Sequence, residues 1–275
     1  MHCPRITIGL FSDAHYAHLV YGDRHCQDSL AKLRVCMDTF NIRQPDLVIN
    51  LGDFIDKADD KEAEAAYLAA VRQVCESFAG DLHYVLGNHD LATFTKMEYL
   101  AACGTEHPEP YYAFENHGVH CVILDSNCHE DGTDFTAGMF DWDDAWVSEA
   151  QLSWLRDDLR RAGDRPVLVF SHGNLDHRLW ENRLDPHVVK NAEQVRSILE
   201  QAGTVRAVIQ AHYHPGLSTT INGIAYIGLR AMVVGAGTVQ NAYALLTLWA
   251  DNTIALEGFD QQPSIRISPE GNIIF

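Results

Sequence analysis

The sequence predicts an α/β protein in which mixed β-sheets pack face to face with helices on the outside. Up to residue 210, short apolar runs alternate with amphipathic segments, a pattern typical of strand–helix units that build parallel sheets. The residues after that read as strands joined by tight turns, with Asn222-Gly223 and Asp251-Asn252 as the clearest turns. Because the 275 residues contain no linker, low-complexity tract or repeat, we expect a single domain over residues 1–275.

The first part of the chain is expected to supply three strands and two helices. The strands are short apolar runs at residues 5–11, 46–51 and 82–86. A helix at about 27–42 has an apolar face made of Leu30, Leu33, Met37 and Phe40. Asp59 should begin the next helix, with Glu62 in capping-box spacing, and Gly80 should end it. Gly80 should do so in a left-handed backbone conformation, and the same is expected where helices end at Gly104, Gly163 and Gly203.

The second part begins with a hairpin and contains two long irregular segments. The hairpin strands are expected at 111–116 and 119–125. Helices at about 149–162 and 190–202 precede strands at 166–171 and 205–210. The irregular segments are residues 126–148 and 173–187. Loops of this length are usually functional or disordered, and disorder is disfavoured in the first by Phe135, Phe140, Trp142 and Trp146.

Composition and charge exclude several classes of protein. A hydrophobic content of 47% and a charged content of 21% are those of an ordinary globular protein, and no apolar run is long enough to span a membrane. A net charge of −18 disfavours nucleic-acid polymers as partners. The amino terminus, MHCPRITIGLF, lacks the pattern of a secretory signal, and the seven cysteines are scattered and odd in number. We therefore expect a cytoplasmic protein without a disulfide framework.

Polar side chains follow five of the expected strands, directly after each strand ends. The stretch YVLGNHD, residues 84–90, is the clearest case, because an apolar run ends in Gly87 and three polar residues follow. Polar groups at the carboxyl ends of strands lie where open α/β sheets bind their ligands. The metal-binding candidates among these groups are Asp13, His15, Asp53, Asn88, His172, His212 and His214.

Imidazole and carboxylate groups without thiolate form the ligand set of manganese, iron or zinc. Seven candidates are too many for one four-coordinate ion and suit two ions that share a carboxylate. Taken singly, each histidine would more readily be structural or surface-exposed, but agreement among five strand ends favours metal binding. The remaining conspicuous histidines are expected to be structural or surface residues: His2, His25, His117 and His187.

This pattern resembles the calcineurin-like metallophosphoesterase superfamily, whose motifs run D-x-H, G-D-x-x-D, G-N-H-D/E, H and G-H-x-H. The resemblance covers residue 6 to about 214. It implies a four-layer α/β/β/α sandwich of two mixed sheets flanked by helices, with a site for two divalent metal ions. One ion would take Asp13, His15, Asp53 and His214, and the other would take Asp53, Asn88, His172 and His212.

The resemblance also implies roles for three residues that do not bind metal. His89 would contact the phosphoryl oxygens or the leaving group, Asp90 would hold His89, and Asp56 would lie behind the ligands. Two positions depart from the family pattern. Ala211 replaces the last motif's glycine, and the sequence around His172 is only loosely like the usual fourth motif.

The expected activity is hydrolysis of a small phosphodiester or pyrophosphate with a nucleotide-like part. Two ions about 3.5–4 Å apart convert a bridging water to hydroxide and clamp a phosphoryl group for in-line attack. A phosphomonoesterase of the same fold is the alternative within the class. A catalytically silent metal-binding scaffold is the alternative outside it, although every ligand position is filled. A Ser-His-Asp hydrolase through Ser171 lacks the G-x-S-x-G elbow.

Some subgroups of the superfamily are disfavoured by individual residues. Asp56 stands where purple acid phosphatases carry a tyrosine ligand, and Lys57-Ala58 stands where serine/threonine protein phosphatases carry Arg-Gly. The chain is more similar to compact bacterial phosphodiesterases and to the manganese-dependent ADP-ribose/CDP-alcohol diphosphatase type, on the basis of the QLSWL segment at 151–155 and Ala242-Tyr243-Ala244. The two irregular segments are expected to wall the substrate pocket, with Trp142, Trp146 and Trp180 as candidate contacts.

Overall fold

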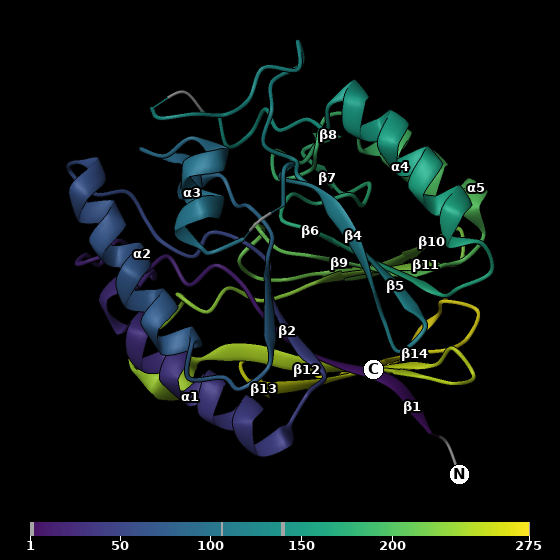
Figure 1. The fold of residues 1–275 in the computed structure, drawn as a ribbon, viewed down its shortest axis with the longest axis horizontal. Coiled ribbons are helices and arrows are strands. Elements are labelled where there is room, and N and C mark those ends of the chain that lie inside the picture. The colour runs from purple at the N-terminus through teal and green to yellow at the C-terminus, as the bar shows by residue number, and fades with distance from the viewer. Residues whose placement is uncertain (1–2, 106, 139–140, 275) are drawn as a thin grey trace.

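The structure, a computed structural model that describes residues 3–105, 107–138 and 141–274, is built on two β-sheets (Figure 1). The seven-stranded sheet has the order β15 (Ile273–Ile274), β14 (Ile265–Ile267), β13 (Ile254–Asp260), β12 (Ala242–Trp249), β1 (Pro4–Phe11), β2 (Leu47–Asn50) and β3 (Asp81–Tyr84). The six-stranded sheet has the order β10 (Ser218–Ile221), β11 (Ile224–Gly228), β9 (Val205–Gln210), β6 (Val167–Ser171), β5 (Val119–Ile123) and β4 (Tyr112–Asn116).

Both sheets are mixed, with parallel strands where the polar strand ends occur. Strands β1, β2 and β3 are parallel, while β12 pairs with β1 in the antiparallel direction. In the other sheet β5, β6, β9 and β11 are parallel, and β4 and β10 are antiparallel to their neighbours. Parallel strands place their carboxyl ends at the same edge of the sheet, so the residues that follow them can meet there.

The two sheets enclose an apolar core between them. Along β1, successive residues point alternately into this core and toward the outer face of the sheet. Ile6, Ile8 and Leu10 belong to the core between the sheets and are fully buried. Gly9 points to the opposite face, where a Cβ would lie 3.0 Å from the Phe40 ring. A larger residue at position 9 would therefore push the neighbouring helix off the sheet.

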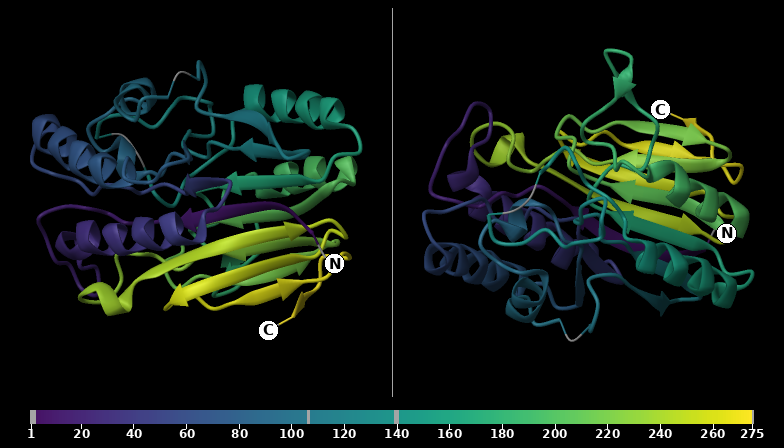
Figure 2. Two further views of the ribbon diagram at one scale, coloured as in Figure 1. Left: turned by 60° about the horizontal axis from the view of Figure 1, so that its bottom comes forward. Right: turned by 90° about the horizontal axis from the view of Figure 1, so that it is seen from above.

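Helices cover the outer faces of both sheets. Helices α1 (Ser29–Arg43) and α2 (Lys61–Cys75) lie beside each other on the side of the seven-stranded sheet. Helices α4 (Glu149–Ala162) and α5 (Ala192–Ala202) cover the six-stranded sheet (Figure 2). A short helix, α3 (Lys96–Ala102), follows β3. The expected four-layer α/β/β/α arrangement is confirmed.

Three local expectations were wrong. Helix α2 begins at Lys61 with Asp60, not Asp59, as its N-cap, because the Asp60 carboxylate accepts a hydrogen bond from the Ala63 N–H. It ends at Cys75 rather than at Gly80, which has no positive φ. The segment 173–187 is not wholly irregular, because it contains a small hairpin formed by β7 (Leu179–Trp180) and β8 (Arg183–Leu184).

Two further observations concern the whole chain. Across the described residues, every helix is too short or too polar to cross a membrane. All seven cysteines are free, and Cys3 is the exposed member of the set. The expectation that the cysteines act as small buried residues therefore holds for the other six.

Candidate metal centre

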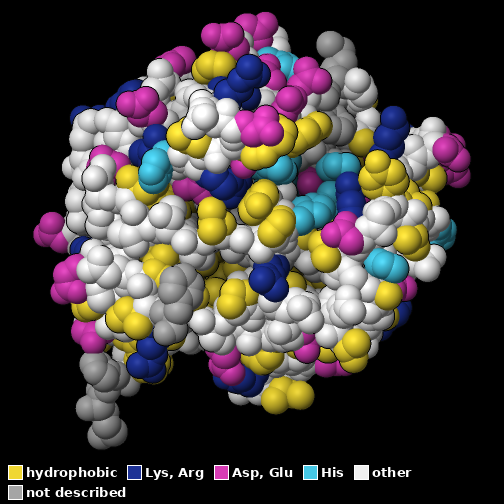
Figure 3. Space-filling model, turned by 180° about the vertical axis from the view of Figure 1, so that it is seen from behind, with side chains coloured by type: hydrophobic (Ala, Val, Ile, Leu, Met, Phe, Trp, Pro, Cys, Tyr) yellow, Lys and Arg dark blue, Asp and Glu magenta, His cyan; other side chains and the backbone are white. Residues whose placement is uncertain are grey.

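The polar residues that follow five strands meet at one edge of the sandwich. Asp13 and His15 follow β1, Asp53 follows β2 and Asn88 follows β3. His172 follows β6, and His212 and His214 follow β9. Each sheet therefore contributes part of the cluster, and six of these seven side chains are buried, with His214 half-buried. Figure 3 shows histidine side chains gathered around a hollow on this side of the molecule.

The main chain takes an unusual conformation at four of the seven positions. Asp13, His15, Asp53 and His212 have φ values of 50°, 44°, 51° and 65°. A residue with a Cβ rarely adopts positive φ, and such strain is kept where the surrounding structure imposes it, often at functional sites. At Asp13 and His15, two main-chain hydrogen bonds hold this conformation. The Asp13 N–H donates to the Gly52 carbonyl at 3.0 Å, and the His15 N–H donates to the Asp53 carbonyl at 2.8 Å.

Two glycines allow the loops after β2 and β3 to approach each other. Gly52 has a φ of +95°, and a Cβ on it would lie 2.6 Å from the Gly87 nitrogen. A Cβ on Gly87 would overlap the main-chain nitrogen and the carboxylate of Asp53. Only glycine fits at either position, because a side chain at 52 would displace Gly87 and His172, and one at 87 would displace Asp53.

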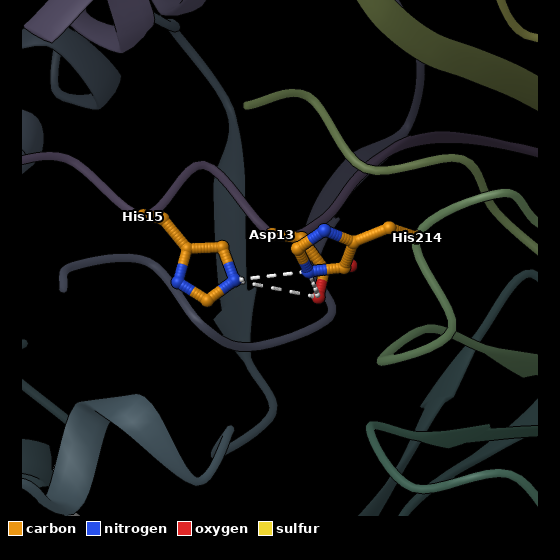
Figure 4. Close-up of side chains that lie close together, drawn as sticks. All are labelled: Asp13, His15 and His214. Atoms are coloured by element: carbon orange, nitrogen blue, oxygen red, sulfur yellow. Dashed lines mark hydrogen bonds and ion pairs between the residues drawn. The ribbon is translucent and has the colours of Figure 1, made fainter. Parts of the chain in front are cut away.

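The first cluster contains Asp13, His15 and His214 (Figure 4). The Nε2 atoms of His15 and His214 lie 3.2 Å apart, and each lies within 3.9 Å of Asp13 Oδ1. Both carboxylate oxygens of Asp13 are buried and have no hydrogen-bond partner among the residues that the structure describes. Burial raises the pKa of Asp13 to about 6 and lowers that of His15 to about 4. Unpartnered buried carboxylate oxygens facing two imidazole nitrogens are the donor set of a cation.

The second cluster contains Asp53, His172 and His212, with Asn88 beside it. His172 Nδ1 lies 2.8 Å from the Leu51 carbonyl, and donation to that oxygen directs Nε2 toward the cluster. This Nε2 lies 3.3 Å from Asn88 Oδ1. His212 Nε2 lies 3.2 Å from the Trp142 carbonyl, so donation there leaves Nδ1 for the cluster. Histidines that bind a metal through one ring nitrogen typically donate a hydrogen bond from the other nitrogen to a carbonyl or carboxylate.

Asp53 lies between the two clusters. Its Oδ2 atom is 3.4 Å from His15 Nε2 and 3.3 Å from His172 Nε2. Burial alone would raise the pKa of Asp53, but His172, His89 and His15 together hold it well below its usual range. The pKa of His172 is raised to about 9, because Asp53 outweighs the effect of burial. One carboxylate oxygen that contacts imidazoles of both clusters has the position expected of a ligand shared by two cations.

These residues fit two divalent cations. The donor set is imidazole, carboxylate and one amide oxygen, with no thiolate, which suits manganese, iron or zinc. Cations bound here would satisfy the buried Asp13 oxygens, which have no hydrogen-bond partner among the described residues. His172, the position whose sequence context was least like the family motif, lies within the second cluster with the others.

The expected partner of His89 was wrong. His89 Nδ1 lies 2.9 Å from Asp56 Oδ1, so Asp56 and not Asp90 orients this imidazole. Asp90 is fully buried, and its carboxylate binds main-chain N–H groups instead of His89. Its carboxylate oxygens accept hydrogen bonds from the N–H groups of Gly87, Asp53, Phe54 and Ile55. Asp90 therefore fixes the two loops that carry Asp53 and Asn88. The other oxygen of Asp56 lies 3.4 Å from His15 Nδ1, behind a metal-binding candidate, as expected.

A cavity of about 720 Å³ opens beside the clusters. Asp53, Asn88 and His89 form part of its wall, and Trp142 lines it with an exposed fraction of 44%. The lining residues that the sequence did not indicate include Arg24, His187, Tyr213 and Arg230. His187 was expected to be structural, but its ring centroid lies 5.1 Å from those of Trp142 and His212. Asp185 holds it through Nδ1 at 2.7 Å.

The remaining tryptophans lie elsewhere. Trp146 is half-buried, and its Nε1 donates to Asp144 rather than facing the cavity. Trp180 is 59% exposed on the β7–β8 hairpin and is absent from the cavity wall as the described residues form it. His25 and His117 lie outside the clusters, as expected. His2 and Phe140, with residue 139 of the expected pocket loop, lie outside the described residues.

Comparison with solved structures supports the fold. A dimetal phosphatase from Danio rerio superposes with a TM-score of 0.83 at 21% identity, covering 97% of this chain and 99% of that one. A purple acid phosphatase from yellow lupin superposes with a TM-score of 0.62 at 12% identity, covering 93% of this chain and 51% of the other.

Comparison with characterised sequences gives several relatives. A manganese-dependent ADP-ribose/CDP-alcohol diphosphatase of Arabidopsis thaliana is 22% identical over 95% of this chain and 96% of its own length. A glycerophosphodiester phosphodiesterase of Enterobacter lignolyticus is 25% identical over 62% of this chain, and the match spans 56% of that relative. The profile of the calcineurin-like phosphoesterases matches residues 6–216. Because this match covers well over half of the sequence and includes all seven clustered positions, the chain belongs to the calcineurin-like phosphoesterase family and is a metal-dependent phosphoester hydrolase.

Proposed function

We propose that this chain hydrolyses a small phosphodiester or pyrophosphate with a nucleotide-like part. The observation that carries the proposal is that two ligand clusters, linked by Asp53 of the second, which lies 3.4 Å from His15 of the first, open into a cavity of about 720 Å³ with an aromatic side chain, Trp142, in its wall. Calcineurin-like phosphoesterases use a dinuclear divalent metal centre. Here Asp13, His15, Asp53 and His214 would hold one cation, and Asp53, Asn88, His172 and His212 the other.

The cations would supply Lewis-acid stabilisation of the phosphoryl oxygens and lower the pKa of the attacking water. The protein residues would contribute orientation and proton transfer. His89 lines the cavity, and because its Nδ1 faces Asp56, its Nε2 is the nitrogen that would meet the leaving oxygen. Asp56 and Asp53 together raise the pKa of His89 against the effect of burial, which favours the protonated form that donates a proton.

A nucleotide-like substrate is supported by the cavity and by one relative. Trp142 offers a ring face at the cavity, and stacking of a base on an aromatic side chain contributes roughly 1–3 kcal/mol. The Arabidopsis diphosphatase, named for ADP-ribose and CDP-alcohols, is similar over nearly the whole chain. A cavity of this size also accommodates more than the phosphate of a simple monoester.

The location and partners follow from composition. Seven free cysteines, six of them buried, support a reducing compartment, for which we propose the cytoplasm. The net charge of −18 makes a nucleic-acid polymer an unfavourable partner, whereas two bound cations would make the site locally positive and attract a small anion.

A substrate panel tests the proposal. Protein loaded with manganese should hydrolyse ADP-ribose, cyclic AMP or bis-p-nitrophenyl phosphate with a higher kcat/KM than p-nitrophenyl phosphate. Preference for p-nitrophenyl phosphate would identify a phosphomonoesterase instead. No turnover of any of the four, with both metals bound, would identify a metal-binding scaffold. Asp53→Ala serves as the inactive control, because it removes the carboxylate that both clusters share.

A further inference from the structure

Arg24 lines the same cavity as Asp53, Asn88 and His89, although it comes from the loop between β1 and α1. The main chain of this loop is held on both sides. Tyr21 and Arg24 exchange two hydrogen bonds at 3.0 Å, and Gly235 N–H donates to the Asp23 carbonyl at 2.9 Å. The main chain that carries Arg24 is therefore held in place before any substrate binds.

The guanidinium group of Arg24 lies against the residues that orient His89. Its Nη2 atom forms an ion pair with Asp56 Oδ2 and lies 2.7 Å from His15 Nδ1. The other oxygen of Asp56, Oδ1, faces His89. Arg24 and His89 are thus attached to opposite oxygens of one carboxylate and lie next to each other at the cavity wall. Nε of Arg24 is buried and has no hydrogen-bond partner within the described part of the chain.

Arg24 is one of two permanently charged cations in the wall of the cavity as the described residues form it. The other, Arg230, is exposed and donates from Nη1 to the Gln261 carbonyl at 2.9 Å. A pyrophosphate brings two phosphoryl groups into the cavity, and the metal clusters can take the group under attack. The second group needs its own cation, and a guanidinium binds phosphate through several N–H donors.

We infer that Arg24 binds the departing phosphoryl group of a pyrophosphate substrate. The inference rests on the proposed function and narrows the substrate class from phosphodiesters or pyrophosphates to pyrophosphates alone. Arg24 lies on the leaving-group side because it shares Asp56 with His89, the residue assigned to the leaving oxygen. A pyrophosphate substrate explains a cation at this place better than a simple diester does, because a diester has no second phosphoryl group for Arg24 to bind.

The hydrolysis that this describes is balanced without a further reactant. A water oxygen forms a bond to the attacked phosphorus, and the bond between that phosphorus and the bridging oxygen breaks. The electron pair stays on the bridging oxygen, which becomes a terminal oxygen of the departing phosphate monoester. His89 donates a proton to this oxygen, one water hydrogen remains on the hydrolysed phosphate, and the other leaves as a proton that balances the one His89 gives up. Arg24 donates hydrogen bonds to the departing group, where negative charge increases.

The test compares binding of two nucleotides that differ by one phosphoryl group. The α,β-methylene analogue of ADP and AMP are titrated into manganese-loaded protein by calorimetry. The wild type should bind the analogue about tenfold to a hundredfold more tightly than AMP, the range expected for one charged hydrogen-bonding contact. Arg24→Gln should lose most of that preference, and Arg24→Lys should retain part of it because a single point charge remains.

Arg34→Gln is the matched control, because Arg34 is an exposed arginine on α1 outside the cavity wall. It removes the same charge and should keep the wild-type preference. The inference is overturned if the wild type shows no preference, or if Arg24→Gln weakens both ligands equally. Equal weakening with lower metal content would make Arg24 a positioning residue for His15 and Asp56. If the preference depends on Arg24 but none of the four panel substrates is hydrolysed, Arg24 still binds the second phosphoryl group and the proposed function fails.

Discussion

One carboxylate oxygen of Asp56 lies 2.9 Å from the Nδ1 atom of His89. A hydrogen bond from Nδ1 to this oxygen fixes both the tautomer and the orientation of the imidazole, as carboxylates commonly do for catalytic histidines. The two residues are therefore expected to act as a unit, with His89 toward the substrate and Asp56 behind it.

His89→Ala should lower kcat by about 10²–10⁴-fold, the usual contribution of a general acid. The loss should be smallest for substrates with a p-nitrophenolate leaving group, which needs little protonation. Both metals should remain bound, because His89 is a neighbour of Asn88 and not one of the proposed ligands. Metal analysis of the purified variant checks this point. If His89→Ala loses metal to the same extent as Asp53→Ala, His89 is a ligand, and the role proposed for it is wrong.

Combining substitutions of Asp56 and His89 gives a further check, because the losses of activity should not be additive if the two residues act together. If Asp56 acts through His89, adding Asp56→Asn to His89→Ala should cost little more activity than His89→Ala alone. Independent losses that multiply would mean that Asp56 acts mainly through His15, which its other oxygen approaches at 3.4 Å.

Asp53 differs from the other metal-binding candidates because both clusters share it. Asp53→Ala should remove both metals and abolish activity on every substrate, since its Oδ2 contacts His15 and His172 at 3.4 and 3.3 Å. Asp13→Ala should reduce metal content by about half, because Asp13 belongs to one cluster only. Metal analysis on protein purified without chelator measures both. Full occupancy reached with a single ion in the wild type would contradict the shared-ligand arrangement.

The strand ends and the metal-binding residues could be predicted because both follow from local pattern. Short apolar runs that end in Gly-Asp or Gly-Asn predict where the chain leaves a buried strand, and parallel strands bring those ends to one edge. Asp53 and His172 illustrate this, since they are distant in sequence and yet lie 3.3 Å apart between Oδ2 and Nε2.

The hydrogen-bond partners of these residues could not be predicted, because they depend on the directions in which side chains point from separate loops. Asp90 follows His89 in sequence, which made it the expected partner, but the short turn after Asn88 directs Asp90 into the protein. Asp56 reaches His89 instead, from the loop after β2. Arg24 and His187 lie in segments without periodicity, so no spacing pattern linked them to the cavity. The Asp185-x-His187 spacing, similar to Asp13-x-His15, was the one local signal for His187.

Asp90 should therefore behave as a structural residue of the loops and not as part of the proton-transfer pair. Asp90→Ala removes an acceptor that four main-chain N–H groups share, so we expect a loss of about 1.5–3 kcal/mol in the free energy of unfolding, together with weaker metal binding. Urea denaturation and metal titration measure the two effects. Unchanged stability with a selective loss for poor leaving groups would return Asp90 to the catalytic role.

The two exposed tryptophans offer a matched pair for the nucleotide-binding proposal. Trp142 lines the cavity, with its ring centroid 6.1 Å from that of His212, whereas Trp180 lies on the β7–β8 hairpin. Trp142→Ala should raise KM about tenfold or more for ADP-ribose, the effect of losing about 1–3 kcal/mol of stacking. It should change KM for bis-p-nitrophenyl phosphate less. Trp180→Ala should leave both KM values near those of the wild type. Equal effects of Trp142→Ala on the two substrates would contradict base stacking.

His120, on β5 and remote from the metal centre, is expected to make stability depend on pH. Its Nδ1 lies 2.5 Å from Glu115 and its Nε2 lies 2.6 Å from Asp158, while Arg165 and Arg161 pair with these carboxylates from outside. A neutral imidazole has one N–H, so only the protonated ring can donate to both carboxylates. Burial opposes protonation, but Asp158 and Glu115 together raise the pKa of His120 above its ordinary value.

A histidine whose pKa is raised in the folded state stabilises the protein fully below its unfolded-state pKa, about 6.5, and loses this contribution as the pH rises through the folded-state value. His120→Gln should therefore reduce the free energy of unfolding by about 1–3 kcal/mol near pH 5.5 and by clearly less near pH 9. Urea denaturation of wild type and variant at the two pH values, with metal content matched, measures the difference. His117→Gln is the control, because His117 is 60% exposed on the same hairpin and should show little effect at either pH. A His120→Gln penalty that is equal at both pH values, or larger at pH 9, would mean that the neutral ring already makes the stabilising contacts.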